Sequence, residues 1–121
     1  MARVFNLQVV KATLIGGPAS PVYSDPELNA TLGTADTLFT QIYVDGVANS
    51  ATDVTVNVEG SNDGVSWDPS LTPKVVSVTT AGAGPSVAFT TFPNQAAFSR
   101  FVVSASKDNA IVRVIACGRS M

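Results

Sequence analysis

Residues 53–69 read DVTVNVEGSNDGVSWDP, and this stretch decides the class of fold. Val54, Val56 and Val58 alternate with polar residues, a period of two that is typical of a β-strand with one buried face. The following SNDG, residues 61–64, is turn chemistry, because Asn and Asp tolerate the left-handed backbone and Gly prefers it. The stretch therefore predicts a strand with its valines in a core, a tight polar turn, and a further strand beginning near Trp67, the chain's only tryptophan.

The same pattern continues along the chain. Short runs rich in Val, Thr, Ile and Phe are separated by Gly, Pro, Asn and Asp, and no window carries a helical stripe. In the run LFTQIYV, residues 38–44, Leu38, Ile42 and Val44 share one face, and Phe39 and Tyr43 share the other. We expect strands near residues 3–14, 38–44, 53–59, 74–79, 86–91, 98–105 and 110–117.

These strands predict an all-β chain, folded as a two-sheet β-sandwich of about seven to eight strands, Greek-key or jelly-roll like. A closed barrel is the alternative. Residues 107–109, Lys-Asp-Asn, predict a tight hairpin between the last two strands. The order of the strands within the sheets does not follow from the sequence.

The first 37 residues differ from the rest. At 121 residues the chain has room for one domain, in which 38–121 would form the sandwich core. Between 15 and 37 the alternation lapses and three prolines and three glycines occur, which predicts a long connection or an arm. The segment before it could add as a strand to a neighbour's sheet, or pair within its own subunit. The residues expected at such an interface are Arg3, Val4, Phe5, Leu7 and Val9.

Several kinds of chemistry are missing from the sequence. There is no histidine, which excludes Ser-His-Asp and Cys-His arrangements and histidine-based zinc sites. No spacing of Asp and Glu marks an acid/base pair, and no glycine-rich phosphate loop precedes a helix. We therefore expect a chain that is not an enzyme and has no catalytic residue and no cofactor. The lone cysteine, Cys117, is expected to be a buried small apolar residue.

Charge is scarce and unevenly distributed. Only 13% of the residues are charged, about half the usual share, so the surface can contact other proteins without desolvating many ions. No Lys or Arg occurs from residue 12 to 73, which separates an acidic middle from basic ends. Such charges could interleave within one subunit or set the register of head-to-tail contacts between subunits. The lack of a basic cluster with aromatics predicts no nucleic-acid partner, and the lack of a long apolar run predicts no membrane partner and no signal peptide.

Two weaker hypotheses concern ligands. Asn62, Asp63 and Asp68 supply oxygens that could bind Ca²⁺, although the spacing of an EF-hand is absent. Trp67 and Tyr43, with Tyr23, could form a platform on which a sugar ring stacks. Packing of Trp67 in the core is the alternative.

The element SNDGVSW, residues 61–67, resembles the strand-turn-tryptophan element SNDGxxW of discoidin-like and other β-sandwich modules. Very similar segments recur in virion proteins of tailed phages. The size and sandwich character resemble the small head decoration, or cement, proteins of that group. The resemblance implies a non-enzymatic structural subunit of a large assembly, made in the host cytoplasm and located in the virion, where it stabilises the capsid.

The same resemblance implies its partners. These would be copies of the chain itself, with a trimer favoured by analogy, and a major capsid protein. The alternatives are a carbohydrate-binding or adhesive β-sandwich module and a subunit of a protein fibre.

Overall fold

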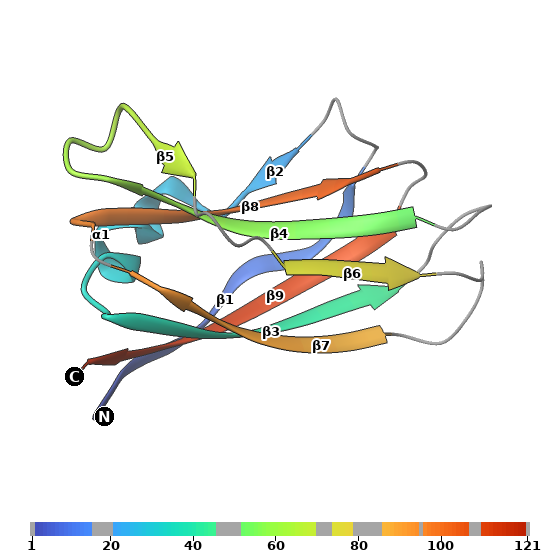
Figure 1. The fold of residues 1–121 in the computed structure, drawn as a ribbon, viewed down its shortest axis with the longest axis horizontal. Coiled ribbons are helices and arrows are strands. Elements are labelled where there is room, and N and C mark those ends of the chain that lie inside the picture. The colour runs from blue at the N-terminus through green and yellow to red at the C-terminus, as the bar shows by residue number, and fades with distance from the viewer. Residues whose placement is uncertain are drawn as a thin grey trace.

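Two antiparallel sheets face each other in the computed structural model (Figure 1), which describes residues 2–15, 21–45, 52–69, 74–78, 86–94, 96–106 and 110–120. Side chains are described for these residues except 2–4, 12–15, 52, 69 and 78. The elements are β1 (Ala2–Ile15), β2 (Val22–Tyr23), the 3₁₀ helix η1 (Pro26–Leu28), α1 (Asn29–Leu32), β3 (Thr37–Asp45), β4 (Thr52–Ser61), β5 (Asp68–Pro69), β6 (Lys74–Val78), β7 (Ser86–Pro93), β8 (Phe98–Ala105) and β9 (Ala110–Ser120).

The strand order is that of a jelly roll. The first sheet has the order β1-β9-β3-β7, and the second has β2-β8-β4 with both β5 and β6 paired to β4. Apart from the two-residue β5, successive strands therefore change sheet at every connection except the one from β4 to β6. Eight strands arranged in this way form two interlocked Greek keys. The prediction of an all-β, two-sheet sandwich is confirmed.

The core lies between the two sheets and is built from alternate residues of each strand. Val54, Val56 and Val58 of β4 are buried, as the alternation predicted. In β3, Leu38, Ile42 and Val44 are buried, while Phe39 is exposed. Two aromatic rings join the sheets, because Phe92 of β7 meets Phe101 of β8 edge-on with centroids 6.0 Å apart.

The predicted tight hairpin between the last two strands is wrong. Strand β8 pairs with β2 and β4 in the second sheet, and β9 pairs with β1 and β3 in the first. The connection between them, which includes residues 107–109 outside the described part, therefore crosses from one sheet to the other. Each of the two strands has partners on both edges, so no edge remains for the other.

The N-terminal segment belongs to the sandwich of its own subunit. Strand β1 pairs antiparallel with β9 from Ala2 opposite Ser120 to Ile15 opposite Ala110. The long connection predicted between 15 and 37 contains β2, η1 and α1 in its described part. The described part of the first 37 residues thus contributes one strand to each sheet, β1 and β2. Of the two alternatives for the N-terminal segment, the structure shows pairing within its own subunit.

We predict that Val56→Asp destabilises the protein severely. The side chain of Val56 is fully buried, so an aspartate there would be an unpaired charge in the core, at a cost of about 3–5 kcal/mol. Urea unfolding measures the loss. Thr55→Asp, one position along the same strand and facing outward, is the control and should change the free energy of unfolding by less than about 1 kcal/mol. Equal stability of the two variants would mean that the facing of β4 is wrong.

Candidate functional site

The SNDG turn is held by its own side chains. Asp63 Oδ1 accepts hydrogen bonds from Ser61 Oγ at 2.8 Å and from the backbone N–H groups of Val65 at 2.8 Å and Ser66 at 2.9 Å. Gly64 has φ +76°, the left-handed conformation that the sequence predicted. The turn closes the short β4–β5 hairpin, in which Gly60 lies opposite Asp68. The turn is therefore stabilised by hydrogen bonds among its own residues.

The turn lowers the pKa of the Asp63 carboxyl group. The N–H groups of Ser66 and Val65 and the hydroxyl of Ser61 stabilise its charged form and lower its pKa from 3.8 to about 2. The side chain is exposed, so it keeps a full negative charge at neutral pH. The turn therefore presents a permanent anion at the surface.

The calcium hypothesis receives no support from this geometry. Asn62 Oδ1 accepts from the N–H of Ala97, at 3.4 Å, and Asp63 Oδ1 is bonded within the turn. Asp68 is exposed and lies in β5. Within the described ranges, no group of three or more Cys, Asp or Glu side chains is placed to hold a metal ion.

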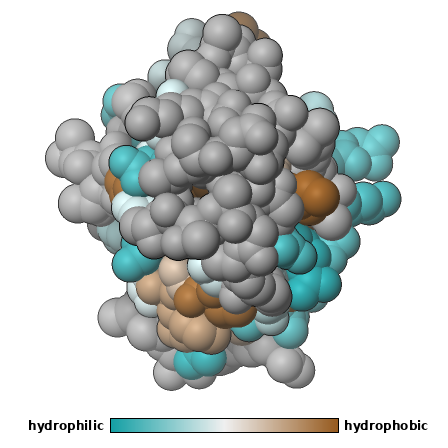
Figure 2. Space-filling view, turned by 90° about the vertical axis from the view of Figure 1, so that its right-hand side faces the viewer, coloured by the Kyte–Doolittle hydropathy of each residue, from teal (hydrophilic) through white to brown (hydrophobic). Residues whose placement is uncertain are grey.

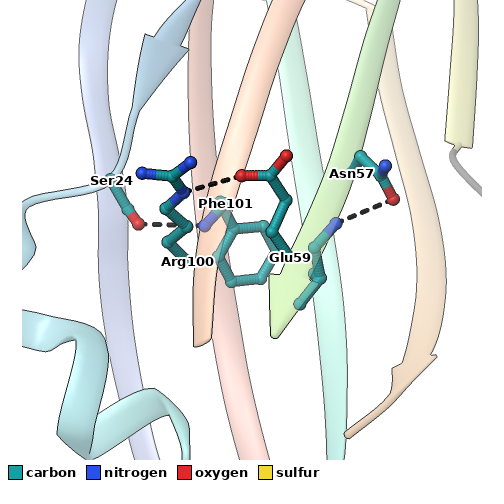
Figure 3. Close-up of polar contacts among 6 residues, drawn as sticks. Ser24, Asn57, Glu59, Arg100 and Phe101 are labelled. Atoms are coloured by element: carbon teal, nitrogen blue, oxygen red, sulfur yellow. Dashed lines mark hydrogen bonds and ion pairs between the residues drawn. The ribbon is translucent and has the colours of Figure 1, made fainter. Parts of the chain in front are cut away.

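On the outer face of the second sheet, one arginine lies between two aromatic rings. The Arg100 guanidinium carbon is 4.4 Å from the centre of the Tyr23 ring and 4.3 Å from that of the Trp67 ring. Arg100 Nε also donates to Glu59 Oε1 of β4 at 2.7 Å (Figure 3). Beside it, the N–H of Phe101 donates to Ser24 Oγ at 2.9 Å, as the same figure shows. These contacts connect β2, β8, β4 and the start of β5.

The position of Trp67 differs from both hypotheses. The ring is half-buried against Arg100, whose neighbours Ser99 and Phe101 are the ones that point inward, so Trp67 lies outside the sheet and not in the core. Tyr43 lies on the outer face of the other sheet, with the Arg113 guanidinium 4.2 Å from its ring centre. The two residues therefore do not form a shared platform. The partner of Trp67 in the structure is Tyr23, through Arg100.

The outer face of the first sheet carries several exposed apolar side chains. Alternate residues of β3, β7 and β9 that do not face the core gather there, and four of them are strongly exposed: Phe39 at 41%, Val87 at 45%, Phe89 at 52% and Ile111 at 41%. In the register, Val87 lies opposite Tyr43, Phe89 opposite Gln41, and Ile111 opposite Asp45 at the end of β3. We call this surface the outer apolar face and define it by Phe39, Tyr43, Val87, Phe89, Ile111, Arg113, Ile115, Cys117 and Arg119. The polar residues Gln41 and Thr91 lie among them. Figure 2, which looks onto the right-hand end of the molecule in Figure 1, shows hydrophobic side chains gathered below the grey residues, on the side of this sheet.

Two arginines lie on this face against aromatic rings. Arg113 covers Tyr43, and the Arg119 guanidinium carbon is 5.9 Å from the centre of the Phe39 ring. Phe39 in turn packs against Phe89 with ring centroids 6.0 Å apart. Neither guanidinium is paired with a carboxylate among the residues that the structure describes. The face therefore combines exposed aromatic area with two cations.

Cys117 also belongs to this face. It is half-buried and alternates with the inward-facing Ala116 and Gly118, so the expectation of a buried core cysteine is wrong. Sequence reasoning missed the outer apolar face because it treated the outward positions as solvent-facing. The signal was present in IVRVIAC, residues 111–117, which is apolar at both alternating positions except at Arg113.

The residues predicted for an intersubunit arm lie mainly against their own subunit. Val9 is buried in the core, which corrects its assignment to an interface. Phe5 and Leu7 are partly buried and pack against the core, and the Phe5 ring occupies the space that a side chain at Gly118 would need. For Arg3 and Val4 only the backbone is described, within β1. Three register shifts interrupt the pairing of β1 with β9, and such irregularities disfavour strand addition at a sheet edge.

No protein-family model matches this chain, and no curated protein sequence matches it. None of the helices in the described ranges has the length and apolar character needed to cross a membrane. Function must therefore be argued from the surfaces themselves.

We predict that Arg100→Ala exposes Trp67. Removing the guanidinium frees one face of the indole and of the Tyr23 ring, and leaves Glu59 without its partner, at a cost of about 1–2 kcal/mol. Tryptophan fluorescence should shift to longer wavelength and be quenched more strongly by iodide. Arg113→Ala, which removes the equivalent stack on the other sheet, should leave the emission unchanged. Identical spectra for the two variants would contradict the observed packing.

We predict that the SNDG turn loosens only in strong acid. Because the pKa of Asp63 is lower in the folded chain than its ordinary 3.8, ionised Asp63 stabilises the turn above about pH 4, and this stabilisation is lost as the pH falls towards about 2. The amide resonances of Val65 and Ser66 in NMR spectra should titrate with a midpoint near 2. Asp63→Asn keeps an acceptor oxygen and should abolish the titration. A midpoint near 4 in the unmodified protein would show that the hydrogen bonds to Asp63 are not formed.

Proposed function

We propose that this protein is a non-enzymatic structural subunit of a large assembly, and specifically a decoration protein of a phage capsid. The outer apolar face is the observation that carries the proposal. Aromatic residues and arginine are the types enriched in the centres of protein interfaces, whereas Lys, Glu and Asp are depleted there. A group of exposed aromatic and aliphatic side chains on one face of a small domain is typical of an interaction surface.

Other features support the same function. The jelly roll recurs in viral capsid proteins, as well as in lectins and cupins, so the fold is compatible with the proposal without deciding it. The low share of charged residues favours extensive protein contacts. In this proposal the partners are further copies of the chain, with a trimer favoured by analogy with phage decoration proteins, and a major capsid protein. The location is the virion, with neither nucleic acid nor membrane as a partner.

A carbohydrate-binding or adhesive module is the second candidate, and the pair of Tyr23 and Trp67 favours it. Tyr23 is 47% exposed on the outer face of the second sheet, close to the half-buried indole. Arg100 covers one face of each ring, however, which leaves less aromatic surface for a sugar to stack on. Arg100 and its bond to Glu59 give this cluster a structural role that needs no ligand. A fibre subunit is a variant of the first proposal, since it would use the same kind of contact.

We predict that the protein self-associates at tens of micromolar through the outer apolar face. Val87→Ser with Phe89→Ser should abolish the association seen by sedimentation velocity, because both side chains are exposed and leave the core intact. Val75→Ser is the matched control, since Val75 is equally exposed on the second sheet. Recovery of the chain with phage particles would support the capsid role. A monomer that is retained on a polysaccharide column and binds no particle would show that the adhesive module is the right class.

A further inference from the structure

We propose that the outer apolar face binds the acidic end of a second copy of this chain, in a head-to-tail contact. The inference rests on the proposed function and names the two surfaces that would meet. The acidic end is defined by four exposed carboxylates, Asp25, Glu27, Asp63 and Asp68. Figure 1 places η1 and the β4–β5 turn, which carry them, at the same end of the sandwich.

The two arginines of the outer apolar face need an anionic partner when that face is buried. Arg113 and Arg119 lie six residues apart on the same side of β9, which separates them by about 20 Å. Arg113 is stacked on the Tyr43 ring at 4.2 Å, so its planar group is already oriented before any partner binds. Arg119 is exposed and lies farther from its ring, at 5.9 Å from the centre of Phe39. A guanidinium removed from water without a carboxylate would oppose binding strongly. An apolar surface with no acidic groups would therefore be a poor partner for this face.

The acidic end offers the complementary charges. The side chain of Asp25 accepts from the N–H of Glu27 in η1, and Asp63 stays ionised through the bonds of its turn. The two segments are joined through Ala97, whose N–H donates to Asn62 and whose carbonyl lies against Gly33, just after α1. No Lys or Arg occurs between residues 12 and 73, the span that contains all four carboxylates. This end is therefore uniformly negative along its own segments.

A head-to-tail contact fits these charges better than a two-fold contact. If the outer apolar face met the same face of another copy, arginines would be brought towards arginines, which is unfavourable. In the described part of the chain, two carboxylates border these arginines, because the N–H of Asp36 donates to the carbonyl of Arg119 and Asp45 lies opposite Ile111. Both already have interactions within their own subunit. The complementary surface thus lies elsewhere on the same chain. Contacts between two different surfaces generate a closed ring or a filament.

A charge-exchange experiment tests the contact. One variant carries Arg113→Glu with Arg119→Glu, and the other carries Glu27→Lys with Asp68→Lys. Each should be monomeric by sedimentation velocity at concentrations where the unmodified protein associates, and a 1:1 mixture of the two should associate again. Asp53→Lys, at the opposite end of β4, is the control and should associate as the unmodified protein does. Circular dichroism and Trp67 emission verify that every variant is folded.

Cys117 supplies an independent measurement at the same face. It is the chain's only cysteine, and its half-buried side chain lies between Phe39 and Asn6 in the register of the first sheet. Its reaction with a maleimide should slow on association of the unmodified protein, and should keep its monomer rate in the Arg113→Glu/Arg119→Glu variant at every concentration.

The possible failures are distinguishable. If the Glu27→Lys/Asp68→Lys variant associates normally while the arginine variant does not, the face binds something other than the acidic end and the inference is wrong. If neither variant changes the association, another surface mediates it, and the inference fails while the structural role stands. A monomer that still binds phage particles also overturns only the inference. A monomer that binds a polysaccharide and no particle overturns the proposed function too.

Discussion

The contact between the inner faces of the two sheets is the interaction on which the rest of this structure depends. Each sheet contributes alternate apolar residues, and the chain has neither a disulfide nor, in its described part, a long helix to stabilise it by other means. The buried side chains are mostly valines and alanines, with two phenylalanines, Phe92 and Phe101, meeting edge-on between the sheets. Small β-branched side chains allow the sheets to approach closely over their whole area. Because the inner faces hold the sheets together, the side chains of the two outer faces are not needed for the core and can differ in composition.

The two outer faces differ in how their side chains are satisfied. On the second sheet, Arg100 joins Tyr23, Trp67 and Glu59, so the polar and aromatic groups there satisfy one another. On the first sheet, four large apolar side chains of β3, β7 and β9 are exposed, and the side chains of Arg113 and Arg119 contact aromatic rings. A side chain that is satisfied within its own subunit gains little from a partner, whereas an exposed apolar surface gains by being covered. This contrast is the physical reason for placing the interaction surface on the first sheet.

The edges of the first sheet also differ. Strand β1 pairs with β9 with three interruptions of the register. Strand β7 pairs with β3 without interruption, from Ser86 opposite Val44 to Pro93 opposite Thr37. An irregular edge resists the addition of another strand. The three register shifts therefore support the proposed association through the face of the sheet rather than through β1. The alternating N-terminal sequence is therefore explained by the pairing of β1 with β9 in the same subunit, without an arm that reaches a neighbour.

The sequence by itself determined the strands and, in β3 and β4, which side chains face the core. All seven expected strands occur, the span 98–105 coincides with β8, and the inward valines of β4 were predicted correctly, because alternation is a local property of the chain. The left-handed conformation of Gly64 was predicted for the same reason, because it depends on the residues of the turn alone. The pairing of the strands could not be predicted in this way. Strands β8 and β9 are neighbours in sequence and yet lie in different sheets, because the partners of a strand are selected by packing across the whole domain. For the same reason only the tertiary structure decided that β1 joins its own sheet, that Trp67 lies against Arg100, and that the outward residues of β3, β7 and β9 form one surface. Each of these depends on segments far apart in sequence, whose approach no local pattern encodes.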